Sequence, residues 1–168
     1  MHMQTNPGES EEFARLEWAI LGLLVTPHNQ RPWSEDEITR AISTPGDVHE
    51  AVTRLRTIGL IHHWNRMVSA TYAAVRYEEI TQEPDDNPVR TRELRMEGSI
   101  LHVLMRTNGV LPMSEKDIRR ALGSKKKDKL DVIDAINRLD GAGLVDRPGG
   151  LVVPSPAAVR FDHYTQSF

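Results

Sequence analysis

Seven cationic side chains lie close together in the second half of the chain, and their types and spacing suggest phosphate binding. They are Lys116, Arg119, Arg120, Lys125, Lys126, Lys127 and Lys129. Lysine and arginine bind phosphate oxygens, and several such contacts give affinity that depends on salt but not on base sequence. Arg147 lies further along the chain and is expected to add one contact. A lysine-rich segment is also typical of an ordinary solvated surface, so polyanion binding is a hypothesis here.

The basic cluster lies in the second of two related segments. Sliding the chain by 80 and then by 84 positions pairs Ile20 with Ile100, Ser34 with Ser114, Arg40 with Arg120, Arg54 with Arg138, Gly59 with Gly143, and residues 73–76 with 157–160. Self-similarity at one long period predicts two copies of a single structural unit. The offset changes where the second copy carries residues 124–127, three of which are lysines.

Charge is divided unequally between the halves. The chain has 168 residues and a formal net charge of −3. Residues 1–84 hold seven arginines, no lysine and twelve acidic residues, a charge of −5, whereas residues 85–168 carry +2. This asymmetry suggests that the two copies have different roles. The chain has no cysteine, no apolar run long enough to span a bilayer and no signal-peptide pattern, so we expect a cytoplasmic protein without disulfides or membrane contact.

Each copy shows the same order of predicted elements. An apolar helix is followed by a second helix capped by Ser34 or Ser114, a third helix, a short hairpin and a closing helix. Thr44 and Asp128 are the expected caps of the third helices. We predict a mainly helical α+β chain. Its expected parts are a disordered segment 1–11, a domain 12–81, a linker 82–91, a domain 92–164 and a tail 165–168.

This order of elements resembles a winged helix-turn-helix domain. The resemblance is carried by EDEITRAI and VHEAVTRLRTIGLI in the first copy, and by EKDIRRAL and VIDAINRLDGAGLV in the second. The opening AILGLL is similar to the first helix of PadR-type regulators, and the second copy resembles small actinobacterial winged-helix proteins. The resemblance implies a bacterial protein with two tandem winged helices. In such domains the third helix enters the major groove and the hairpin, or wing, contacts backbone or minor groove.

The resemblance also implies which residues would face DNA. The outward stripe of the third helix is expected to hold Glu50, Thr53, Arg54 and Thr57 in the first copy, and Asp131, Asp134, Asn137 and Arg138 in the second. Arginine suits guanine edges or phosphates, and asparagine suits adenine. Glu50 and Asp134 count against binding, because carboxylates are repelled by phosphates, and this stripe is alternatively a solvated helix face. The first copy adds only Arg40, Arg56 and Arg66, so we expect it to bind DNA weakly or to serve assembly.

Catalysis and metal binding find no support in the sequence. There is no nucleophile elbow, no glycine-rich phosphate loop and no recognisable pair of carboxylates, so we expect no enzyme and no cofactor. His62 and His63 are adjacent in a predicted strand and point to opposite faces, which argues against a shared metal. The remaining histidines, including His28, His49 and His102, lack ligand-like spacing.

The sequence therefore predicts a cytoplasmic DNA-binding protein, a transcriptional regulator that contacts duplex DNA mainly through its second winged helix. The rival interpretation is a protein–protein adaptor that does not bind DNA, and a regulator that senses a small molecule is a third. A homodimer or a protein partner would use the first domain and the closing helices. The apolar residues that suggest such contacts, or else an internal core, are Trp64, Tyr72, Tyr77, Leu130, Ile133, Phe161 and Tyr164.

Overall fold

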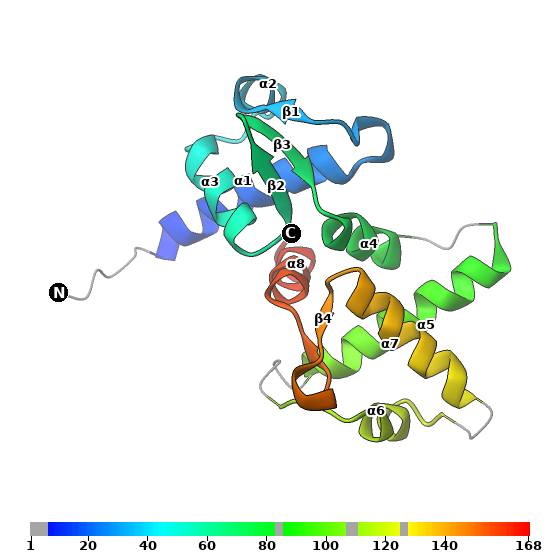
Figure 1. The fold of residues 1–168 in the computed structure, drawn as a ribbon. Coiled ribbons are helices and arrows are strands. Elements are labelled where there is room, and N and C mark those ends of the chain that lie inside the picture. Colours follow the sequence, from blue (N-terminus) through cyan, green and yellow to red (C-terminus); the bar gives the residue numbers. More distant parts are fainter. Residues whose placement is uncertain (1–6, 83–85, 107–110, 125–127) are drawn as a thin grey trace. The chain divides into compact units, whose positions relative to one another are not determined.

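A computed structural model describes residues 7–82, 86–106, 111–124 and 128–168. The fold is mainly helical with two small antiparallel sheets (Figure 1). The elements in chain order are α1 (Pro7–Val25), η1 (Pro27–Asn29), β1 (Trp33–Ser34), α2 (Glu35–Ala41), α3 (Val48–Thr57), β2 (Ile61–Trp64), β3 (Met67–Ala70), α4 (Tyr72–Thr81), α5 (Pro88–Arg106), α6 (Glu115–Ala121), α7 (Lys129–Gly141), β4 (Val145–Asp146), η3 (Pro148–Gly150), β5 (Val153–Pro154) and α8 (Pro156–Ser167). None of the helices within these described ranges is both long and apolar enough to cross a membrane.

The chain divides into two compact units whose bounds differ from the predicted domains. Unit 1 holds residues 1–74 and 162–168, and unit 2 holds residues 75–161. The closing helices α4 and α8 are therefore each shared between units. Within unit 1, the fully buried Tyr164 donates its hydroxyl hydrogen to the buried carboxylate of Glu17 on α1. Within unit 2, Arg76 on α4 pairs with Glu97 on α5. These contacts assign the end of α8 to unit 1 and most of α4 to unit 2.

Unit 1 packs α1 and α3 against a three-stranded sheet of order β1-β3-β2. The strands are antiparallel, with Ile61 opposite Ala70 and Trp64 opposite Met67. Asn65 and Arg66 close the hairpin with φ of 48° and 63°, the left-handed conformation that a two-residue hairpin turn requires. The core is formed by side chains that are fully buried, among them Leu16, Ile20, Leu24, Ile38, Leu55 and Val68.

Unit 2 repeats much of this arrangement with a shorter hairpin. Strands β4 and β5 pair two residues each, and Met113 bridges to Val152 where β1 pairs with β3 in unit 1. Tyr77 and Phe161, expected either at a partner contact or in an internal core, are buried, and their rings stack with centroids 4.6 Å apart. The other core residues of the unit include Ile100, Leu104, Ile118, Ile136, Leu139 and Leu144.

Capping side chains set the helix starts, and three starts differ from prediction. The Ser34 hydroxyl accepts from the Glu37 amide at 3.2 Å, which confirms the predicted Ser34 cap, and Glu37 accepts from the Ser34 amide at 2.8 Å, which completes a capping box. Helix α3 is capped by Asp47, not by Thr44, because the Asp47 carboxylate accepts from the Glu50 amide. Helix α1 begins at Pro7, inside the predicted disordered segment, and α5 begins at Pro88, inside the predicted linker. Proline fits a helix's first position, where its missing amide hydrogen is not needed.

Candidate nucleic-acid interface

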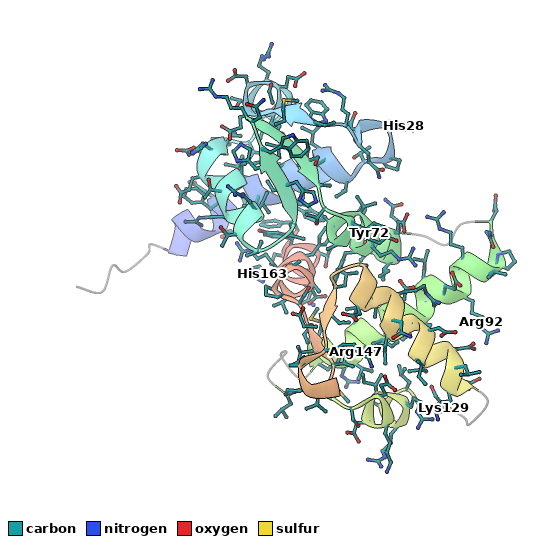
Figure 2. All side chains as sticks on the ribbon, in the orientation of Figure 1. His28, Tyr72, Arg92, Lys129, Arg147 and His163 are labelled. Carbon is teal, nitrogen blue, oxygen red and sulfur yellow. The ribbon has the colours of Figure 1, made fainter. Side chains whose placement is uncertain are left out.

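The basic cluster is borne by α6 and the start of α7 in unit 2. Lys116 and Arg120 are exposed on α6, Arg119 is half-buried, and Lys129 is exposed at the first residue of α7 (Figure 2). Lys125, Lys126 and Lys127 lie outside the described residues. Helix α6 forms because Ser114 caps it by accepting from the Asp117 amide at 3.2 Å, and buried Ile118 fixes its inner face. Cations at positions 116 and 120 are thereby turned outward.

The charges on α6 are partly compensated by one carboxylate. Asp117 lies 3.4 Å from the guanidinium of Arg120. A hydrogen bond from the Ser114 hydroxyl, and the nearby charges of Arg120 and Lys116, hold the pKa of Asp117 below its usual value. This carboxylate remains ionised at neutral pH, yet Lys116 and Arg120 together exceed it by one positive charge. Lys129 is exposed at the start of α7, and its charge adds to the surplus.

Arg147, predicted to contact backbone from the hairpin, is held by two internal contacts. Its guanidinium donates to Glu115 on α6 at 2.5 Å and to the Asn137 side-chain oxygen on α7 at 2.9 Å. Arg147 lies directly after β4 (Figure 2), and its two hydrogen bonds reach both helices. Arg147 therefore fixes the hairpin to α6 and α7. The Asn137 oxygen, which would accept from an adenine amino group, already accepts one hydrogen bond from Arg147.

Arg138 does not lie on an outward stripe of α7, which corrects the sequence-based expectation. Its Nε donates to the carboxylate of Glu97 at 2.6 Å, and a terminal nitrogen lies 3.8 Å from Glu93. Both acids belong to α5, so the side chain turns toward that helix. A second arginine, Arg76, makes two hydrogen bonds to Glu97, at 3.0 and 2.9 Å. Burial lowers the pKa of Arg76, but its hydrogen bonds to Glu97 and Glu79 raise it more, so Arg76 stays charged.

The exposed face of α7 carries acids and one large apolar residue. Leu130 is 69% exposed and Asp134 is exposed one turn later. Asp131 accepts from Arg92 of α5 at 2.5 Å. Ile133 is half-buried beside them. Because Arg138 turns toward α5, Lys129 is the cation of α7 that is exposed to solvent. It is the first residue of α7 and belongs to the basic cluster.

In unit 1 the equivalent arginine is also engaged. Arg54 pairs with Glu50 at 2.8 Å and stacks over the ring of Phe13 on α1, with its central carbon 4.5 Å from the ring centroid. Arg56 and Arg66 are exposed and line a pocket of about 520 Å³ beside Trp64. Glu35 and Asp36 line the same pocket and offset both arginines. Weak binding of DNA by unit 1 stays a prediction from the sequence.

Two histidines in that pocket converge on one carboxylate, which the spacing in the sequence did not indicate. His49 Nδ1 lies 3.2 Å from Glu35, and His63 Nε2 lies 3.1 Å from it. Position 49 is on α3 and position 63 on β2, so only the folded hairpin brings them together. Within the described ranges, no group of three histidine, cysteine or acidic residues is arranged to hold a metal ion.

The most buried charged groups were missed by the sequence reasoning. Among the residues that the structure describes, Glu17 and Glu97 are the buried acids, and they occupy equivalent positions at the offset of 80. Both stand within the apolar stripe of the first helix of their copy. A glutamate repeated at a core position of two diverged copies is the signal that could have revealed them. No protein-family model matches the chain, and no curated protein or solved structure is significantly similar to it.

Proposed function

We propose that the chain is a tandem winged-helix protein that arose by internal duplication. The proposal is supported by the order of elements, which is helix, short extended segment, helix, turn, helix, hairpin and helix in both copies. It is also supported by Gly59 and Gly143, which end α3 and α7 at equivalent positions with φ of 81° and 77°.

The proposed role is that of a cytoplasmic, non-enzymatic transcriptional regulator that binds duplex DNA mainly through unit 2. The observation that carries this proposal is the set of exposed cations Lys116, Arg120 and Lys129 on α6 and at the start of α7, of whose charges Asp117 compensates one. In a winged helix this is the edge that grips the sugar-phosphate backbone. Because Arg138 and the oxygen of Asn137 are engaged internally, phosphate contacts should dominate and base selectivity should be low.

Titration of a labelled duplex at several salt concentrations tests this role. Arg120→Glu should weaken binding and lower the salt slope, because each phosphate contact contributes about 0.9 to that slope. Arg40→Glu is the matched control, since Arg40 is the exposed residue at the equivalent position of α2 in unit 1. Substituting Lys125, Lys126 and Lys127 together by glutamate should abolish binding. Equal affinity of all these variants and the natural chain would refute the role of unit 2.

The second candidate function is a protein–protein adaptor. It is favoured by the exposed Leu130 and Asp134 on α7, because an apolar residue beside carboxylates is poorly suited to a groove lined by phosphates. The same titration separates the two functions. Submillimolar binding with a steep salt slope supports DNA binding, whereas no binding to duplex DNA at low salt supports the adaptor.

A further inference from the structure

A pocket of about 420 Å³ lies within unit 2, between α5 and the segment that follows α6. One wall is a single face of α5, because the lining residues 88, 91, 92, 95, 96 and 99 recur at helical spacing. Leu122 and Ser124 form the other wall. A volume of this size suits a small organic molecule.

The lining combines positive charge with an apolar floor. Arg92 and Arg95 supply two guanidinium groups, while Pro88, Met96 and Leu122 supply apolar surface. Ser124 adds a hydroxyl group. None of the described residues that line this pocket is acidic. Guanidinium groups bind phosphate oxygens through paired, charge-assisted hydrogen bonds, and two of them on one helix face match a dianion.

We propose that this pocket binds a small organic phosphate, with the phosphoryl group between Arg92 and Arg95 and an apolar body against Met96 and Leu122. The inference goes beyond the proposed function, because it assigns a ligand site on α5 rather than a contact of α6 or α7 with DNA. The phosphoryl group itself could come from a free metabolite or from a nucleic-acid backbone. The apolar floor favours the metabolite.

Arg92 links this pocket to α7. Its partner there is Asp131, at 2.5 Å, with the two side chains 72% and 44% exposed. Exposed ion pairs contribute little stability, so a phosphate dianion can displace Asp131 at small cost. Displacement leaves an unpaired carboxylate in the first turn of α7 and places further negative charge nearby. The ligand should therefore weaken DNA binding, and this last step alone rests on the proposed function.

Phenyl phosphate is a suitable probe, and the full-length chain is the protein to test. Backbone amide shifts of residues 89–99 and 122–124 should move saturably with phenyl phosphate in the millimolar range, at constant ionic strength, and much less with phenol. Arg95→Gln should weaken binding about tenfold, as expected for loss of a charge-assisted contact. Arg106→Gln is the control, because Arg106 is an exposed arginine on the last turn of α5 that does not line the pocket.

Asp131→Asn provides a sharper test. It removes the carboxylate that competes for Arg92, so phenyl phosphate should bind more tightly to this variant than to the natural chain. Non-specific attraction to surface arginines would give the same affinity for Arg95→Gln and Arg106→Gln, and would overturn the inference. The absence of saturable shifts in the natural chain would also overturn the inference. So would a result in which Arg95→Gln loses DNA binding while the natural chain does not bind phenyl phosphate. Saturable binding to a chain that binds no DNA would support the pocket and refute the proposed function instead.

Discussion

Arg138 of α7 donates its Nε hydrogen to the fully buried carboxylate of Glu97 on α5 at 2.6 Å. Arg76 of α4 binds the same carboxylate with two further hydrogen bonds. Glu79 joins the network through Arg76 at 2.8 Å and through Arg90 at 2.7 Å. Three helices of unit 2 are thus tied to one buried anion. The buried charge of Glu97 stabilises the fold only while the arginines that bind it remain in place.

Removing the buried charge should destabilise unit 2 strongly. Glu97→Gln removes the buried anion that Arg76 and Arg138 share and leaves them only Glu79 and the more distant Glu93, and breaking a buried pair typically costs about 3–5 kcal/mol. Urea unfolding followed by circular dichroism measures this loss. Glu50→Gln is the matched control in unit 1, because the Glu50–Arg54 pair is exposed and should change stability by less than about 1 kcal/mol. A similar small effect for both variants would show that the network contributes little.

Tyr164 should be a stability determinant of unit 1, although it lies near the end of the chain. Its hydroxyl donates to buried Glu17 and its ring lies 6.0 Å from that of Trp18. Tyr164→Phe should lose about 1.5–3 kcal/mol, the usual worth of a hydrogen bond to a charged group, and Tyr164→Ala should lose more because a cavity follows. Thermal unfolding provides the measurement. Equal stability of the natural chain and Tyr164→Phe would exclude a stabilising role for the hydroxyl.

The sequence predicted local structure better than it predicted ion pairs. The Ser34 cap and the short hairpins act through backbone conformation within a few residues, so their signals are local, and the structure contains both. Arg138 was assigned to an outward stripe because helical spacing alone does not say whether a long side chain reaches solvent or a neighbouring helix. Its direction is set by Glu97, 41 residues away.

The bounds of the two compact units differ from those of the predicted domains for a related reason. A repeat in the sequence shows where each copy begins and ends, but not which helices a closing helix packs against. The contacts of Arg76 with Glu97, and of Tyr164 with Glu17, decide that packing and are made only in the folded chain. The pocket on α5 could not be predicted from the sequence either, because only the fold brings Ser124 and Arg95 to the same pocket.

Two glycines should respond oppositely to alanine. Gly46 has φ of 138°, and an added Cβ would lie 2.7 Å from a methyl group of Leu16, so Gly46→Ala should destabilise unit 1. Gly22 is within α1 and an added Cβ would meet nothing within 4 Å, so Gly22→Ala should stabilise the helix by up to about 1 kcal/mol. Chemical denaturation of both variants checks the signs. A stabilised Gly46→Ala chain would contradict the strained conformation.

The capping box of α2 should make stability depend on pH in acid. Hydrogen bonds from the Ser34 amide, Arg31 and the Ser34 hydroxyl hold the pKa of Glu37 below its usual 4.5. The folded chain therefore releases this proton more readily than the unfolded chain, so the stabilisation is complete above pH 4.5 and is lost as pH falls through the lowered value. Glu37→Gln keeps a side chain able to accept from the Ser34 amide but cannot titrate. Between about pH 5 and about pH 3 the natural chain should lose more stability than Glu37→Gln, as measured by urea unfolding at each pH. Parallel curves would show that the ionised carboxylate adds nothing to the cap.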